Sequence, residues 1–268
     1  TARIGYSLPN QDQGIGFTYL GSSSQLYESS LMIGNSATKV SDMVRNSGTN
    51  FDDDFQAVSL IQRVIPAVTS DFDLVGFFND DNAGSSKLSV FVRNDTYGWA
   101  AAAHRKYIVR KYTIYNNNVI PLNTLYAGIF ADWDVQNASF NKADFDSANR
   151  MAYTYSTQAS PIYCGIKLLS YSGLAVNSID NVGGGAGGID ISDGFSTAEK
   201  YLSLSTNRQQ AGNTTGSGND VVQVLSAGPF LMQPDDSVVV EFAMMAGSSL
   251  QDLQISAMMA QQKYDSIY

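Results

Sequence analysis

Short apolar runs with the alternation of β-strands recur along the whole chain, and polar clusters separate them. Val, Ile, Phe and Tyr dominate the runs, and these residues favour strands. The clusters between them are rich in Asn, Asp, Gly and Ser, which favour turns. Many strands with short connections predict a mainly β protein, and we expect residues 1–268 to form a single domain. Its expected architecture is a large antiparallel two-sheet sandwich of the jelly-roll or super-sandwich type. The strand-like runs cover residues 15–20, 74–78, 87–93, 107–115, 125–133, 151–156, 162–170, 220–226 and 237–246.

Two of the longest runs are close in the sequence. Residues 106–117 and 122–133 read as neighbouring strands joined by an Asn-rich turn and Pro121. The first of them overlaps HRKYIVRK, residues 104–111, which is the only local basic cluster. We expect its charges to share one solvated strand face.

Two segments have helical signals. Ser196 and Glu199 form a capping box that predicts a short helix near residues 196–204. Apolar residues spaced three and four apart predict a C-terminal helix near residues 249–266, with Ser249 as its N-cap. We expect this helix to close the sandwich.

The composition of the chain restricts the kinds of molecule that it can bind. Hydrophobic residues make up 44% of the chain and charged residues only 15%, so a large core fits the sequence better than disorder does. The net charge of -9 argues against nucleic acid, because phosphate binding needs a positive surface. The sequence also lacks the 18 or more consecutive apolar residues, roughly, of a membrane span.

The chain has a single Cys, Cys164, and a single His, His104. No internal disulfide can form, and Cys164 lies in an apolar run as a small side chain that we expect to be buried. Zinc sites usually need more His and Cys ligands than this chain supplies. A Ser-His-Asp site would require His104, but no G-x-S-x-G motif accompanies it. We therefore assign no catalytic residue.

Asp132 and Asp134 finish the apolar run 125–133 on either side of Trp133. Side chains two apart on a strand share a face, so both carboxylates point one way and Trp133 the other. Asp144 and Asp146 follow, again two residues apart.

Three interpretations of these aspartates remain open. Oxygen-rich clusters bind calcium, so Asp132, Asp134, Asp144 and Asp146 are candidate calcium ligands, although their spacing does not match an EF-hand. Carboxylates at strand ends also cap turns and backbone N–H groups. A glycosidase-like acid/base pair needs two carboxyl groups across a sugar-sized cleft, which two positions on one strand face do not build alone.

Three segments carry a resemblance: FADWD at 130–134, GFSTAEK at 194–200, and residues 228–247, which include PDDSVVVEFAMMAG. With the order of the other runs, they make nearly the whole chain similar to a β-rich region of large secreted Bacteroidetes and Ignavibacteria proteins. That region lies between a subtilisin-like peptidase domain and a type IX secretion sorting domain. The resemblance implies an extracellular or cell-surface protein exported across the outer membrane, and it brings no catalytic residues. We expect the chain to be a processed or excised piece.

The resemblance also implies a modification. Proteins exported in that lineage are commonly O-glycosylated at Asp-Ser or Asp-Thr followed by a small aliphatic residue. The triplets DSA, DSV and DSI make Ser147, Ser237 and Ser266 candidate glycosylation sites.

These observations predict a non-catalytic extracellular or cell-surface β-sandwich module with a structural, adhesive or assembly role. We expect it to associate with itself, as a homo-oligomer, surface layer or filament, or with neighbouring domains of a longer protein. A carbohydrate- or peptide-binding accessory module of a secreted peptidase, which would contact surface glycans, is the alternative. A hydrolase that uses Asp132 and Asp134 is a third.

Overall fold

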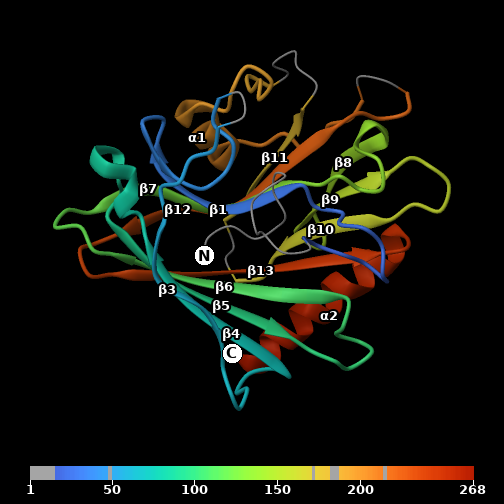
Figure 1. Cartoon of the computed structure of the whole chain (residues 1–268), viewed down its shortest axis with the longest axis horizontal. Coiled ribbons are helices and arrows are strands. Elements are labelled where there is room, and N and C mark those ends of the chain that lie inside the picture. The colour runs from blue at the N-terminus through green and yellow to red at the C-terminus, as the bar shows by residue number, and fades with distance from the viewer. Residues whose placement is uncertain (1–15, 48–49, 171–172, 182–186, 214–215) are drawn as a thin grey trace.

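The computed structural model describes residues 16–47, 50–170, 173–181, 187–213 and 216–268. Two antiparallel sheets pack face to face as a sandwich. In Figure 1 the five-stranded sheet lies in the upper half and β3 to β6 and β13 of the eight-stranded sheet lie below it, while β8, β9 and β10 of that sheet lie at the upper right. The predicted mainly β fold class is confirmed.

The five-stranded sheet is antiparallel throughout, with β7 at its centre. Strand β7 is buried along most of its length because the second sheet covers one face and a helix covers the other. In spatial order the strands are β11 (Ala175–Asp180), β12 (Val221–Met232), β7 (Leu122–Asp132), β1 (Glu28–Ser36) and β2 (Lys39–Ser41).

The eight-stranded sheet is also antiparallel, and β3 and β8 form its two edges. Two short 3-10 helices, Asp81–Ser86 and Ala138–Phe140, lie in its connections. In spatial order the strands are β3 (Gln56–Arg63), β4 (Phe72–Asn79), β5 (Val90–Gly98), β6 (Tyr107–Asn116), β13 (Ser237–Gly247), β10 (Tyr163–Leu168), β9 (Met151–Ser156) and β8 (Asn141–Asp146).

The main core fills the space between the sheets. Trp133 follows β7 and points into this core, as the alternation of its run predicts. Tyr112 and Ile114 of β6 face it from the other sheet. Cys164 is buried among these residues, and its prediction as a small core side chain is confirmed. Burial of so much apolar surface is the main stabilising contribution to the sandwich.

Both predicted helices are present. Helix α1 (Thr197–Ser205) begins with the Ser196–Glu199 capping box and packs on the outer face of the five-stranded sheet. Helix α2 (Leu250–Ile267) begins after Ser249, whose hydroxyl accepts the Asp252 N–H, and covers part of the outer face of the eight-stranded sheet. Among the described residues, no helix has the length and apolar character that crossing a membrane would need.

Three local predictions need correction. The runs at 106–117 and 122–133 form β6 and β7, but these strands belong to different sheets. The turn between them crosses the sandwich, and the Asn116 amide fastens it to the carbonyls of Ile120, Met232 and Gln233. The described residues of the run 15–20 form no strand.

The third correction concerns the basic cluster. Its charges do not share one wet face, because Arg110 is only 6% exposed. Arg110 alternates with Tyr112 and Ile114 toward the inner face of the sheet, whereas Lys111 points outward beside Glu241.

Candidate metal centre

Four strands of the five-stranded sheet begin or finish at the same end of the sheet, and several polar side chains lie close together there. Glu28 begins β1 and lies opposite Asp132, the last residue of β7. Asp132 also pairs with Val222 of β12. Asp220 directly precedes β12 and therefore lies at this end of the sheet as well. Asn181 follows β11. Because neighbouring strands are antiparallel, starts of strands lie beside ends of strands.

Arg45, in the loop after β2, lies over this edge. Its Nε donates to Glu28 Oε2 at 2.9 Å, its Nη1 donates to Asn181 Oδ1 at 3.0 Å, and its Nη2 contacts Asp132 Oδ2. Asn181 in turn donates to Asp220 Oδ2 at 3.0 Å. One guanidinium thus organises an acidic cleft of about 230 Å³, lined by Tyr27, Arg45, Asp132, Asp134, Asn181 and Asp220.

Three carboxylates converge in this acidic cleft. One oxygen each from Asp132, Asp134 and Asp220 lies within 4.8 Å of the other two. Asp132 is only 2% exposed, and its Oδ1 has no hydrogen-bond partner. Asp220 Oδ1 has none either. Buried carboxylate oxygens without a donor are rare, because desolvation of a charged group is unfavourable unless it is compensated.

Positive charge is scarce in the acidic cleft. Burial raises the pKa of the Asp132 carboxyl well above its ordinary value, and the nearby Arg45 only partly offsets this. Burial and the neighbouring Asp220 raise the pKa of Asp134 to about 6. Burial raises the pKa of Asp220 as well. A further cation in the cleft would hold all three groups in their ionised form.

The residues fit a hard divalent cation. Calcium takes about six to eight oxygen ligands at roughly 2.3–2.6 Å, so oxygens that share one ion lie within about 5 Å of one another. Asp132, Asp134 and Asp220 meet that condition, and the Oδ1 atoms of Asp132 and Asp220, which have no hydrogen-bond partner, are available as ligands. Water completes the shell in many such sites. These acidic residues can therefore bind a metal ion such as calcium.

The other two predicted ligands lie elsewhere. Asp144 and Asp146 are on β8, at an edge of the eight-stranded sheet. Asp146 accepts hydrogen bonds from Asn149 and from Gln254 of α2, each at 2.8 Å. Its carboxylate ties the turn after β8 to that helix. The structure does not bring these two aspartates into the acidic cleft.

Arg45, Asn181 and Asp220 were not anticipated from the sequence. A signal for Asp220 was present, because it stands directly before the apolar run of β12 just as Asp132 ends the run of β7. The pairing of β7 with β12 places these two positions side by side. That pairing links distant parts of the chain and cannot be read from either run.

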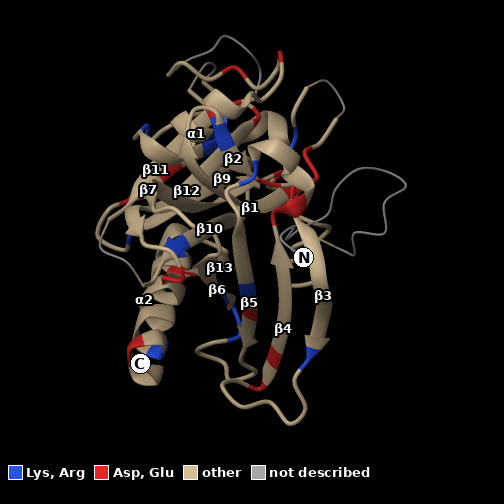
Figure 2. Cartoon of the chain, turned by 90° about the vertical axis from the view of Figure 1, so that its left-hand side faces the viewer, with Lys and Arg blue, Asp and Glu red and all other residues tan. Residues whose placement is uncertain are grey.

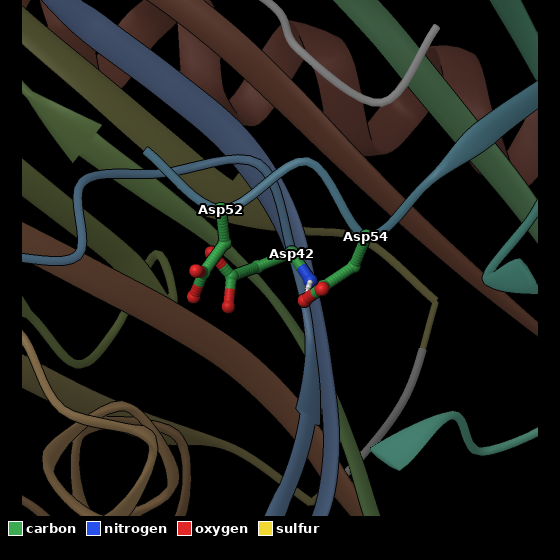
Figure 3. Close-up of side chains that lie close together, drawn as sticks. All are labelled: Asp42, Asp52 and Asp54. Atoms are coloured by element: carbon green, nitrogen blue, oxygen red, sulfur yellow. Dashed lines mark hydrogen bonds between the residues drawn. The ribbon is translucent and has the colours of Figure 1, made fainter. Parts of the chain in front are cut away.

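A second acidic triad lies near the end of β2, formed by Asp42, Asp52 and Asp54 (Figure 3). Here the Nζ of Lys200, from α1, lies 2.7 Å from Asp42 Oδ1 and 2.7 Å from Asp52 Oδ2. Asp54 Oδ2 accepts the backbone N–H of Asp42 at 3.0 Å. Burial would lower the pKa of Lys200, but the two carboxylates outweigh this and raise it. The Lys200 ammonium thus compensates the negative charge of this triad.

The candidate glycosylation sites are all exposed. Ser147 lies in the turn after β8, Ser237 begins β13, and Ser266 is near the end of α2. Their accessibility is compatible with modification, which stays a prediction.

Comparison with known proteins identifies a fold. No protein-family model and no curated protein matches this sequence. A bacterial glucoamylase, solved in complex with acarbose, has a similar structure with a TM-score of 0.53 and 12% sequence identity. The similarity covers 90% of this chain but 30% of the glucoamylase chain. The molecule thus has a β-sandwich architecture that also occurs within a larger carbohydrate-active enzyme.

Proposed function

We propose that this chain is a non-catalytic β-sandwich module of an exported, cell-surface protein, and that it assembles with further copies of itself through the edge strand β3. The observation that carries the proposal is the exposed apolar surface of that strand. Leu60 is 70% exposed and Val58 is 55% exposed. Among the described strands, β3 pairs only with β4, and that pairing is irregular between residues 57 and 62. The outward row of β3 backbone groups therefore pairs with no described strand.

Edge strands are normally protected by charges, by proline or by shortness, because an open apolar edge invites another strand. Within β3 only the last residue, Arg63, is charged, and the ribbon is tan along nearly its whole length (Figure 2). Ile65 and Val68, in the connection to β4, are exposed as well. The surface favours pairing with a second strand over contact with water.

The charges at the two ends of β3 favour an antiparallel partner of the same sequence. Asp53 and Asp54 precede the strand, and Arg63 ends it. If two copies pair antiparallel about a two-fold axis, Arg63 of each copy comes close to the acidic end of the other. Parallel pairing would instead put like charges together.

The geometry of the acidic cleft supports a structural role better than a catalytic one. Arg45 and Asn181 both contact Asp132 Oδ2 and hold that side chain in place. The cleft volume of about 230 Å³ is below the roughly 300–1,000 Å³ of most ligand pockets. A bound cation would join the end of β7 and the segment after it to the loop before β12.

Sedimentation velocity over a range of protein concentrations tests the assembly. The unmodified chain should form dimers or larger species, and Leu60→Lys should be monomeric at the same concentration. Val119→Lys is the matched control, because Val119 is even more exposed, at 88%, but lies in the turn between β6 and β7. It should not change the association.

A charge exchange tests the antiparallel arrangement itself. Arg63→Asp and Asp53→Arg should each weaken the association, and the double variant should restore it. A chain that remains monomeric at the highest soluble concentration would contradict the proposal. Rescue that fails in the double variant would exclude the antiparallel pairing but leave association through β3 standing.

A row of aromatic side chains favours a second candidate, a carbohydrate-binding accessory module. Phe77, Phe91 and Tyr115 lie side by side on β4, β5 and β6, with ring centroids 5.9 and 6.0 Å apart. They are partly exposed on the outer face of the sheet. Sugar rings stack on such surfaces. Phe91→Ala should abolish retention on an immobilised glycan, while Phe72→Ala, at the far end of β4, should not.

A further inference from the structure

A buried polar patch lies on the inner face of the eight-stranded sheet, apart from the acidic cleft. Arg110 of β6 lies opposite Thr96 of β5, and Tyr112 lies opposite Asn94. Tyr112 belongs to the core between the sheets, so side chains on its face of the strand point inward. We call Asn94, Thr96, Arg110 and Tyr112 the inner polar patch; all of them are buried.

Each member of the inner polar patch has side-chain atoms without a hydrogen-bond partner. These atoms are Nε and Nη2 of Arg110, both amide atoms of Asn94 and Oγ1 of Thr96. Tyr112 Oη has no partner with good hydrogen-bond geometry, although the Arg110 guanidinium lies close to this side chain, with Cζ 5.6 Å from the ring centroid. Within the described part of the chain, Arg110 also forms no ion pair. Arg93, on the opposite face of β5, shows the usual arrangement, since it donates to Asp95 at 2.8 and 2.9 Å.

The free donors of Arg110 have a definite geometry. Nε–H and Nη2–H lie along one edge of the planar guanidinium and point in parallel, and this edge matches the two oxygens of a carboxylate. Asn94, Thr96 and Tyr112 offer amide and hydroxyl groups that both donate and accept hydrogen bonds. Hydroxyl groups on a ligand would satisfy them.

A cavity lies further along the same face of β6, although the patch residues themselves do not line it. This cavity of about 350 Å³ is lined by Phe17, Tyr19 and Ile108, among others. Ile108 precedes Arg110 by two positions on β6, so their side chains share a strand face about 7 Å apart. This volume falls within the roughly 300–1,000 Å³ of small-molecule sites.

We propose that the inner polar patch binds the carboxylate of a small hydroxylated acid, such as a sugar acid. The guanidinium edge of Arg110 holds both carboxylate oxygens, and the ligand hydroxyls bond to Asn94, Thr96 and Tyr112. The body of the ligand extends toward the cavity beside Ile108. This site is separate from association through β3, because β4 lies between β3 and the strands that carry the patch.

Thermal unfolding and isothermal titration of the full chain test the site, with glucuronate, glucose and inorganic phosphate as probes at equal ionic strength. Glucuronate should bind and raise the midpoint of unfolding. Glucose, which lacks the carboxylate, should bind at least tenfold more weakly. Phosphate should also bind at least tenfold more weakly, because its tetrahedral oxygens match the patch less well.

Variants distinguish binding at the inner polar patch from effects that any arginine substitution on this sheet would have. Arg110→Met should abolish glucuronate binding, and Arg110→Lys should weaken it at least tenfold because a lysine cannot bind both oxygens in one plane. Arg93→Met should bind glucuronate like the unmodified chain. Thr96→Val provides a second test should Arg110→Met not fold, and it should weaken binding severalfold.

The proposal is overturned if glucuronate neither binds nor raises the unfolding midpoint, or if Arg110→Met binds it unchanged. Equal binding of phosphate would overturn the assignment of a carboxylate ligand. Equal binding of glucose would show that Arg110 takes no part in recognition.

Discussion

The two aspartate triads have the same composition but differ in how their charge is compensated. In the triad of Asp42, Asp52 and Asp54, a fully buried lysine ammonium lies 2.7 Å from two carboxylates. In the acidic cleft, Arg45 is the neighbouring cation among the described residues, and Glu28 occupies part of its guanidinium.

This difference indicates which triad is complete. The ammonium of Lys200 lies between the carboxylates of Asp42 and Asp52 and compensates their charge, as a metal ion would. In the acidic cleft one oxygen each of Asp132 and Asp220 has no donor, whereas among the described, buried atoms of the first triad only Asp42 Oδ2 has none. The spacing of acids in a sequence cannot separate these two cases, because both cations come from other segments.

The largest effect should follow from removal of the internal cation. Lys200→Met leaves Asp42 buried without its partner, and loss of one member of a buried ion pair typically costs about 3–5 kcal/mol of unfolding free energy. Urea unfolding measures this value. The double variant Lys200→Met/Asp42→Asn should regain part of the loss because it removes both charges.

Lys87 provides the control for this substitution. Its ion pair with Asp81 is exposed and screened by solvent, so Lys87→Met should leave the unfolding free energy nearly unchanged. If Lys200→Met were as mild as Lys87→Met, the first triad would not depend on its lysine.

The next effect should come from calcium. A cation that binds only the folded chain adds about 2.7 kcal/mol of stability when its concentration is 100 times its Kd. Calcium should therefore raise the unfolding midpoint of the unmodified chain, and EDTA should reverse the change. Asp134→Asn and Asp220→Asn should each remove most of the response, because they line the acidic cleft.

Two groups of variants sharpen this test. Asp144→Asn and Asp146→Asn should respond to calcium like the unmodified chain, because these residues lie apart on β8. Asp52→Asn should also keep the response, since Lys200 already serves its triad. A response lost in the β8 variants and kept in Asp220→Asn would assign the ion to β8.

The sequence predicted most of the fold because its pattern is local. The alternation of apolar residues identified β7 and placed the side chains of Asp132 and Trp133 on opposite faces of the chain. Capping residues identified both helices. It could not predict the acidic cleft, since Asp220 and Arg45 reach Asp132 only through strand pairing and a long loop. The predicted exposure of Arg110 was wrong for another reason. Its neighbours in HRKYIVRK suggested a wet face, whereas the alternation with Tyr112 and Ile114 already pointed inward.

A smaller effect should appear in the pH dependence without calcium. The pKa of Asp134 is raised to about 6 from 3.8, so between these values the folded chain keeps a proton that the unfolded chain has released. The unfolding free energy should therefore fall as pH rises from about 4 to about 7, by about 2 kcal/mol after solvent screening is allowed for.

Calcium should flatten this dependence, because it favours the ionised carboxylates of the folded chain. Unfolding free energies of the unmodified chain and Asp134→Asn, measured at several pH values in EDTA, isolate the contribution of this group. An unmodified chain whose stability rises over this interval as steeply as that of Asp134→Asn would contradict the prediction.

The smallest effect concerns Asp54, the outer member of the first triad. Its carboxylate accepts the Asp42 N–H, a role that an asparagine oxygen can take over (Figure 3). Burial raises the pKa of Asp54 to about 6, so its ionised form is disfavoured in the folded chain at neutral pH. Asp54→Asn should therefore stabilise the chain by about 1 kcal/mol at pH 7, and the gain should shrink toward pH 4, where the folded wild-type carboxyl is already protonated. Urea unfolding at both pH values measures the gain. A loss of stability at pH 7 would instead mean that Lys200 needs the third negative charge, and the first triad would then be short of anions rather than complete.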